Sequence, residues 1–274
     1  MNKILSKRLL ADKVNEYVIE APNVAKHAKP GQFVILRVDA DGERIPFTIC
    51  GMDKEKGTIT LLIQSVGYST MKLAELNVGD YIHDFAGPLG NATDLGSYKK
   101  VLLVGGGIGA AVIYPQAKYL MDIGRPADSI VGARNKSLIM YEDEFKADSE
   151  HFYLVTDDGS YGKKGFVTDM IKELLDNGEK YDCIFAVGPM VMMRAVCNLT
   201  KEYGVHTIVS MNSIMVDGTG MCGGCRLTVD GKTKYACVDG PEFDGHLVDF
   251  NEAISRSKFY NEQEKKHVCR LRGE

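Results

Sequence analysis

Three cysteines and one aspartate between positions 217 and 237 are the residues of this sequence best placed to do chemistry. Their order is Asp217-x4-Cys222-x2-Cys225-x11-Cys237, in a segment rich in glycine. Plant-type 2Fe-2S clusters are held by Cys-x4-Cys-x2-Cys and a later fourth cysteine, so the match has one substitution. A carboxylate oxygen can replace a thiolate on iron, and glycine lets a loop wrap closely around inorganic sulfide. We predict a 2Fe-2S cluster with these four residues as ligands.

Three other interpretations of this segment stay open. Zinc can be held by three cysteines and one aspartate, although structural zinc sites favour paired Cys-x2-Cys units or histidine partners. A cysteine cluster without metal is the second alternative. In the third, Asp217 only caps the glycine-rich loop, and another residue or water completes the iron shell.

A second candidate site is the glycine stretch VLLVGGGIGAAVIYP, which follows a predicted strand and opens a predicted helix. Gly106, Gly107 and Gly109 allow a backbone to approach a pyrophosphate, and the helix N-terminus offers free N–H groups to its charge. Two further strand ends carry Asp157 in TDDGSYG and Gly188, Pro189 and Met190 in AVGPM. Because ligands of open parallel sheets bind at the carboxyl ends of strands, we predict a nicotinamide dinucleotide site there.

The choice between NAD and NADP rests on the segment GARNKSLIMYEDEF. A 2'-phosphate is usually held by basic side chains, and Arg134 and Lys136 stand here. The acidic run Glu142, Asp143 and Glu144 follows them and favours NAD(H).

The elements that must position these residues change in character near residue 98. Short β-rich runs such as QFVILRV and GTITLLIQ, separated by turn formers, predict an antiparallel β barrel over residues 1–97. Strands then alternate with helices over residues 98–212, which predicts a parallel α/β sheet. Residues 213–274 contain the cysteines and are predicted to form a smaller cluster-binding unit.

Composition excludes several classes of protein. The chain has 274 residues, 45% hydrophobic content and a formal net charge of -4, which gives no reason to expect nucleic acid or an anionic membrane surface as a partner. No apolar run reaches the roughly 20 residues of a membrane span. Seven cysteines, an odd number, make a poor disulfide framework. We expect a cytoplasmic protein.

The glycine loop and the VGPMVMM turn, placed after a β barrel, resemble the ferredoxin-NADP reductase-like flavoproteins, whose barrel binds FAD. The segment ERIPFTIC resembles the flavin motif of that family. The arginine of the motif would fall on Ile45, whereas the arginine of this chain, Arg44, stands one residue earlier. A second flavin segment is LLIQSVGYST. The resemblance implies that FAD is bound by Arg44, Pro46, Phe47, Thr48, Leu62, Ile63 and Gln64, with Ser69 and Thr70 at the pyrophosphate.

The order of barrel, nucleotide domain and C-terminal 2Fe-2S loop resembles the electron-transfer subunits of dihydroorotate dehydrogenase B, which have four cysteine ligands. The aspartate and the following CVDGPEFDGHLVDF are similar to the small subunits of NADH-dependent ferredoxin:NADP oxidoreductase, an electron-bifurcating transhydrogenase, and of sulfide dehydrogenase-like relatives. The resemblance implies an oxidoreductase subunit that moves electrons between NAD(H), FAD and the cluster, in a heterodimer or higher heteromer with a large iron-sulfur flavoprotein. The alternative from another class is a non-catalytic regulatory subunit containing zinc.

Overall fold

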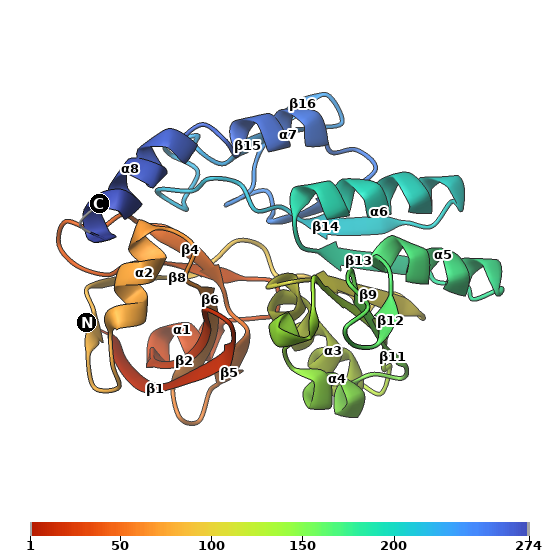
Figure 1. Ribbon diagram of the computed structural model, residues 1–274, viewed down its shortest axis with the longest axis horizontal. Coiled ribbons are helices and arrows are strands. Elements are labelled where there is room, and N and C mark those ends of the chain that lie inside the picture. Colours follow the sequence, from red (N-terminus) through yellow and green to blue (C-terminus); the bar gives the residue numbers. More distant parts are fainter. Residues whose placement is uncertain (1, 273–274) are drawn as a thin grey trace.

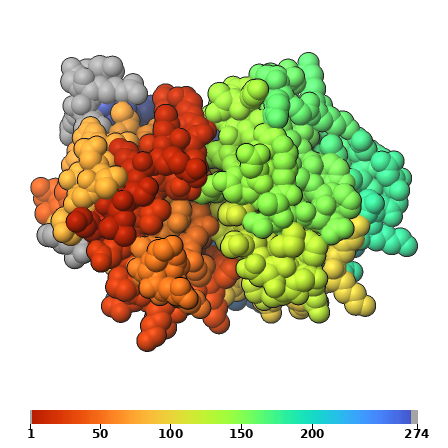
Figure 2. Space-filling view, turned by 90° about the horizontal axis from the view of Figure 1, so that it is seen from below, coloured from red at the N-terminus to blue at the C-terminus, as the bar shows by residue number. Residues whose placement is uncertain are grey.

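Two lobes lie side by side in the computed structural model, which describes residues 2–272 (Figure 1). Figure 2 shows the N-terminal lobe, in red and orange, against the nucleotide lobe, in yellow to green, with a seam between them. The C-terminal segment, in blue in Figure 1, runs from the nucleotide lobe back to the barrel. Because of this path, the segment with the cysteines contacts both lobes.

The N-terminal lobe is an antiparallel β structure. One sheet has the order β5-β6-β2-β1-β7 and a second has the order β4-β3-β8. Apolar side chains of both sheets, such as Tyr17, Ile19, Leu36 and Leu61, are buried between them. Its elements are β1 (Asn2–Ala11), β2 (Val14–Glu20), α1 (Pro22–His27), β3 (Phe33–Arg37), β4 (Ile45–Thr48), β5 (Gly51–Asp53), β6 (Thr58–Gln64), α2 (Tyr68–Glu75), β7 (Tyr81–Ile82) and β8 (Asp84–Leu89).

The second lobe is built on a seven-stranded sheet with the order β12-β11-β10-β9-β13-β14-β17. All its neighbouring strands are parallel except β14 and β17. Its elements before the cysteine segment are β9 (Val101–Gly106), α3 (Gly109–Asp122), β10 (Asp128–Ala133), the 3-10 helix η1 (Lys136–Leu138), α4 (Glu142–Asp148), β11 (Phe152–Thr156), β12 (Lys163–Lys164), α5 (Val167–Asp176), β13 (Cys183–Val187), α6 (Met190–Glu202) and β14 (Thr207–Ser210).

Alternate residues of β9 point to opposite faces of this sheet, as the pleat of a strand requires. Val101 and Leu103 pack under α3 and α4, whereas Leu102 and Val104 pack under α5 and α6. Both faces are therefore covered, which explains the continuous apolar sequence of the central strands.

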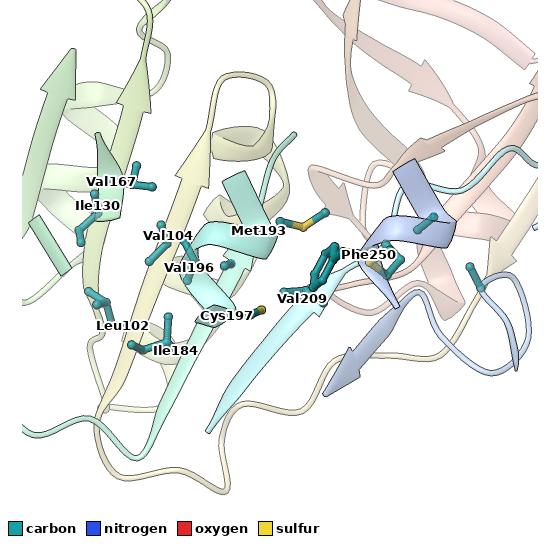
Figure 3. Close-up of a cluster of buried hydrophobic side chains, with 14 of the residues drawn as sticks. Leu102, Val104, Ile130, Val167, Ile184, Met193, Val196, Cys197, Val209 and Phe250 are labelled. Carbon is teal, nitrogen blue, oxygen red and sulfur yellow. The ribbon is translucent and has the colours of Figure 1, made fainter. Parts of the chain in front are cut away.

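The cysteine segment shares the core of the nucleotide lobe. Its elements are β15 (Arg226–Val229), β16 (Lys232–Tyr235), β17 (Glu242–Asp244), α7 (Phe250–Arg256) and α8 (Asn261–Arg272). Strand β17 joins the edge of the large sheet by pairing with β14. Figure 3 shows Phe250 of α7 beside Val209 and Met193, in the same apolar cluster as Leu102 and Ile184. This segment is thus held by the nucleotide lobe.

A small apolar cluster joins the two lobes. Cys50 and Leu62 from the barrel pack with Ala111 and Met140 from the nucleotide lobe. Burial raises the pKa of the Cys50 thiol to about 12, so this cysteine serves in packing. The cluster holds the start of α3 and the segment before α4 against the barrel.

The fold confirms the predicted antiparallel unit followed by a parallel α/β unit. Four elements of the barrel were not predicted: strands β1 and β5, helix α1, and helix α2, which begins within the second flavin segment at Tyr68. No helix among residues 2–272 is both long and apolar enough to cross a membrane.

Candidate functional site

The predicted nucleotide loop lies at the centre of the large sheet. It connects β9 to α3, and the sheet runs to β10 on one side of β9 and to β13 on the other. This is the point where the strand order reverses, where open α/β sheets bind their ligands. Gly107 has a φ of +56°. A Cβ on Gly109 would overlap the carbonyl of Val187 at the end of β13, so glycine there allows α3 to begin against the neighbouring strand.

The turn from β13 to α6 lies directly beside that loop. A Cβ on Gly106 would come within 3.4 Å of the Pro189 ring, and one on Gly188 would lie 3.2 Å from the Cα of Gly106. The structure therefore brings together the glycines of two predicted motifs. The thioether of Met192 covers both Gly106 and Gly188, a contact that no sequence pattern indicates. Met190 lies beside Ser213 and Gly224 of the cysteine segment.

Arg134 and Asp157 follow the strands on the other side of β9 and are exposed. The backbone N–H of Asp157 donates to the carbonyl of Ala133 (3.0 Å), so the ends of β10 and β11 are tied together. The Lys136 ammonium lies 4.7 Å from the centre of the Tyr161 ring, and the Tyr161 hydroxyl donates to Glu142 (2.9 Å). Of the acidic run, Glu142 is therefore linked through Tyr161 to Lys136.

The first predicted flavin segment forms β4, whose four residues are all half-exposed. Pro46, Phe47 and Thr48 pair with β3, and Phe47 packs partly on the barrel core. A strand that leaves apolar side chains half-covered suits the flat ring of a flavin. On β6, Gln64 is half-exposed, but Leu62 packs against the nucleotide lobe and Ile63 packs inside the barrel. Of Leu62, Ile63 and Gln64, only Gln64 therefore has a side chain that a flavin could contact.

Ser69 and Thr70 lie in the first turn of α2. The Thr70 hydroxyl accepts hydrogen bonds from the N–H groups of Val66 and Gly67, both at 3.0 Å. The Ser69 hydroxyl donates to Glu43 (2.9 Å). A helix N-terminus is a suitable place for a pyrophosphate. Both predicted residues lie at the N-terminus of α2.

Arg44 does not point toward the first turn of α2. Its Nε donates to the carbonyl of Val216 (3.0 Å), and its Nη2 lies 3.5 Å from the carbonyl of Asp217. The predicted flavin arginine thus holds the start of the cysteine loop against the barrel. Gly218, with a φ of +83°, continues this contact, because a Cβ there would clash with Ile35.

Three of the predicted cluster ligands, Asp217, Cys222 and Cys225, lie on the loop before β15, and the fourth, Cys237, follows β16. The sulfur atoms of Cys225 and Cys237 are 3.2 Å apart, and both side chains are buried. Cys222 is exposed and accepts a hydrogen bond from the N–H of Gly224 (3.4 Å), which is the main cause of its lowered thiol pKa. Burial raises the pKa of the Cys237 thiol. Two of the three thiols are therefore buried and close together, whereas the third faces solvent.

Asp217 caps its own loop in this structure. Its Oδ2 accepts hydrogen bonds from the hydroxyl of Thr219 (2.6 Å) and from the N–H groups of Thr219 (2.9 Å) and Met221 (3.2 Å). These bonds lower the pKa of the carboxyl. Within residues 2–272, no three of the four predicted ligands have their donor atoms within 4.8 Å of one another. The ligand role of Asp217 remains a prediction.

Glu242 is a buried carboxyl group that sequence reasoning missed. Both of its carboxylate oxygens are buried without a hydrogen bond of good geometry to the described residues. The hydroxyls of Thr93 and Ser210 lie near it and favour the charged form, but burial is the larger effect and raises its pKa to about 8. The group is therefore mostly protonated at pH 7. It lies where β17, the end of β14 and the linker after the barrel meet.

The types of residue at each predicted site suit the cofactor predicted there. Three thiols and a carboxylate, with three glycines of positive φ between Asp217 and Cys225, suit an iron-sulfur cluster. The half-exposed strand β4 and the first turn of α2 suit a flavin dinucleotide, and the adjoining glycine turns suit a nicotinamide dinucleotide.

Two family models match this chain. Residues 2–93 match the oxidoreductase FAD-binding domain. Residues 212–249 match the iron-sulfur cluster binding domain of dihydroorotate dehydrogenase B. The predicted order, with the flavin domain before the cluster, is confirmed by these matches.

Similar proteins cover nearly the whole chain. A dihydroorotate dehydrogenase B electron transfer subunit homolog of Thermotoga maritima is 47% identical over 97% of this chain and 93% of its own length. The corresponding subunit of Bacillus caldolyticus is 35% identical over 88% of this chain and 94% of its own. A chain in the structure of NADH-dependent reduced ferredoxin-NADP oxidoreductase, described for flavin-based electron bifurcation, is 44% identical with a TM-score of 0.94, covering 99% of this chain and 98% of that one. This chain therefore belongs to the family of the dihydroorotate dehydrogenase B electron-transfer subunits and their homologues.

Proposed function

We propose that this chain is the subunit that passes electrons between NAD(H), FAD and a 2Fe-2S cluster to a larger partner, in an enzyme like NADH-dependent reduced ferredoxin-NADP oxidoreductase. One observation carries the proposal: the loop with the predicted cluster ligands is held against the FAD-binding lobe by Arg44 and Gly218. The match of a solved oxidoreductase chain at 44% identity supports the choice of enzyme.

The chain itself binds and orients the reacting groups. When bound, a nicotinamide supplies a hydride, a flavin accepts two electrons and releases them singly, and a 2Fe-2S cluster carries one at a time. The glycine turns after β9 and β13 place Gly106 and Gly188 side by side where the nucleotide would bind, and β4 offers a half-exposed apolar strand to the flavin. No side chain need act as an acid or base for hydride transfer, so the roles that we assign are binding and positioning.

The rim of the cysteine loop is where we place the partner. Met221 is 87% exposed and Val216 is 53% exposed, beside the exposed Cys222. Apolar side chains around a redox site suit contact with another protein. The partner that fits is a large iron-sulfur flavoprotein with its own electron-accepting centre near this rim.

A second candidate has the same chemistry with another partner. Relatives at 35% identity are named as electron-transfer subunits of dihydroorotate dehydrogenase B, so the partner could instead oxidise dihydroorotate. Asp217, at the position of a cysteine ligand in that family, favours the first candidate. Identification of the large subunit that co-purifies with the chain from its source organism decides between them.

The cluster assignment is tested by a pair of cysteine variants. We expect the purified protein to contain one FAD and two irons and to lose its iron in Cys222→Ser, with flavin retained. The matched control is Cys269→Ser, an exposed cysteine on α8 outside the loop, which should keep both. A wild-type protein with zinc and no flavin would refute the proposed function, as would full iron content in Cys222→Ser.

A further inference from the structure

The C-terminal helix α8 lies on the first turn of α2 (Figure 1). The Tyr68 N–H at the start of α2 donates to Oε1 of Glu264 from α8 (2.5 Å). Gly67 makes this approach possible, since a Cβ there would collide with the same oxygen. A carboxylate thus occupies the helix N-terminus, where an anion is stabilised by free N–H groups and the helix dipole.

Two further contacts hold α8 in this place. The His267 ring meets the Tyr68 ring edge-on, with centroids 5.8 Å apart. Its Nδ1 lies 3.9 Å from the Glu43 carboxylate, and Glu43 accepts the hydrogen bond of Ser69. The first turn of α2 is therefore engaged by two carboxylates, one from the barrel and one from α8.

This arrangement conflicts with a pyrophosphate at Ser69 and Thr70. The pyrophosphate of FAD is anionic and would need the N–H group that Glu264 takes. It would also lie beside two carboxylates of like charge, whose repulsion is strong where water is partly excluded. Both anions cannot bind the same helix end.

We propose that α8 is a displaceable strap, in which Glu264 takes the place of an FAD phosphate on α2 and must leave when FAD binds. The proposal rests on the proposed function, in particular on the FAD-binding role of α2. The strap lowers the apparent affinity for FAD by the fraction of molecules in which it is closed. It also covers a polar helix end in the flavin-free chain.

The test uses flavin-free protein and measures FAD binding by quenching of flavin fluorescence. Glu264→Ala and a chain ending at Tyr260 should bind FAD roughly tenfold more tightly than wild type, as expected for loss of one hydrogen bond to a charged group. Glu262→Ala, an exposed glutamate on the same helix, is the matched control and should match wild type. Circular dichroism verifies that each variant is folded.

A second readout follows the strap itself. Trypsin should cleave after Lys265 and Lys266 several-fold faster in wild-type protein loaded with FAD than in the flavin-free form. Equal or weaker FAD affinity in Glu264→Ala and in the shortened chain, or equal cleavage rates in both forms, overturns the strap and leaves the FAD-binding role intact. Failure of every variant and of wild type to bind FAD overturns the proposed function and the strap together.

Discussion

Replacement of Glu242 by glutamine should make the protein more stable at neutral and alkaline pH. Burial raises the pKa of this carboxyl from 4.5 to about 8. A glutamate in the unfolded chain ionises near pH 4.5, so from there to pH 8 the folded state holds a proton that the unfolded state releases. Wild-type stability therefore falls as pH rises through this window and stays low above it. The Glu242→Gln variant carries no such linkage at this position.

The magnitude follows from the width of the window. One pKa unit corresponds to about 1.4 kcal/mol. The stability of Glu242→Gln relative to wild type should therefore rise by about 3 kcal/mol from pH 4.5 to pH 7, and by about 5 kcal/mol by pH 9. The amide of glutamine has its own hydrogen-bonding needs, which shift the difference by a constant amount. The slope with pH is thus the quantity to measure.

Urea unfolding of both proteins at pH 5, 7 and 9, at equal cofactor content, gives this slope. Glu55→Gln, an exposed glutamate on the barrel, is the control and should show no pH-dependent difference. A difference between Glu242→Gln and wild type that is flat across this range would refute the reasoning. It would mean that Glu242 is ionised in the folded protein.

Three further predictions concern the cofactors. Asp217→Ala should make the cluster labile with FAD retained, and Asp217→Cys should keep it with a changed electron paramagnetic resonance spectrum and potential; an unchanged spectrum and potential would mean that Asp217 is only a cap. Arg44→Ala should speed iron loss several-fold by removing the bonds to Val216 and Asp217, whereas weaker FAD binding at normal iron retention would show that Arg44 serves the flavin. Steady-state kinetics should give a lower Michaelis constant for NADH than for NADPH, and the reverse would show that Arg134 and Lys136 select the 2'-phosphate.

Most elements of the nucleotide lobe could be predicted because their patterns are local, whereas the short elements η1, α4 and β12 were missed. The run VLLVGGGIG combines an apolar strand with glycines, and β9 and α3 begin within a residue of the expected positions. The spacing of the cysteines was equally informative, since it is set by the cluster geometry. Both are short-range signals that need no knowledge of the rest of the chain.

Contacts between distant segments could not be predicted. Arg44 has the residue type of a phosphate ligand, but its partners are carbonyls 172 and 173 positions away. The charged residues around Glu242 in the sequence suggest exposure, but the pairing of β17 with β14 and the nearby linker bury its carboxyl. The contact of Glu264 with α2 joins residues 196 positions apart. Each depends on where the C-terminal segment packs on the rest of the chain, which no local pattern encodes.

The most direct test of electron transfer through this chain is to mix it with NADH under anaerobic conditions, with and without its FAD. The reduced cluster is then followed by electron paramagnetic resonance on rapidly frozen samples. We predict that NADH bleaches the flavin first and that the signal of the reduced 2Fe-2S cluster follows, and that flavin-depleted protein gives no cluster signal until FAD is restored. Cluster reduction by NADH at the same rate in flavin-depleted protein, or a bleached flavin with a cluster that stays oxidised at any NADH concentration, would contradict the account.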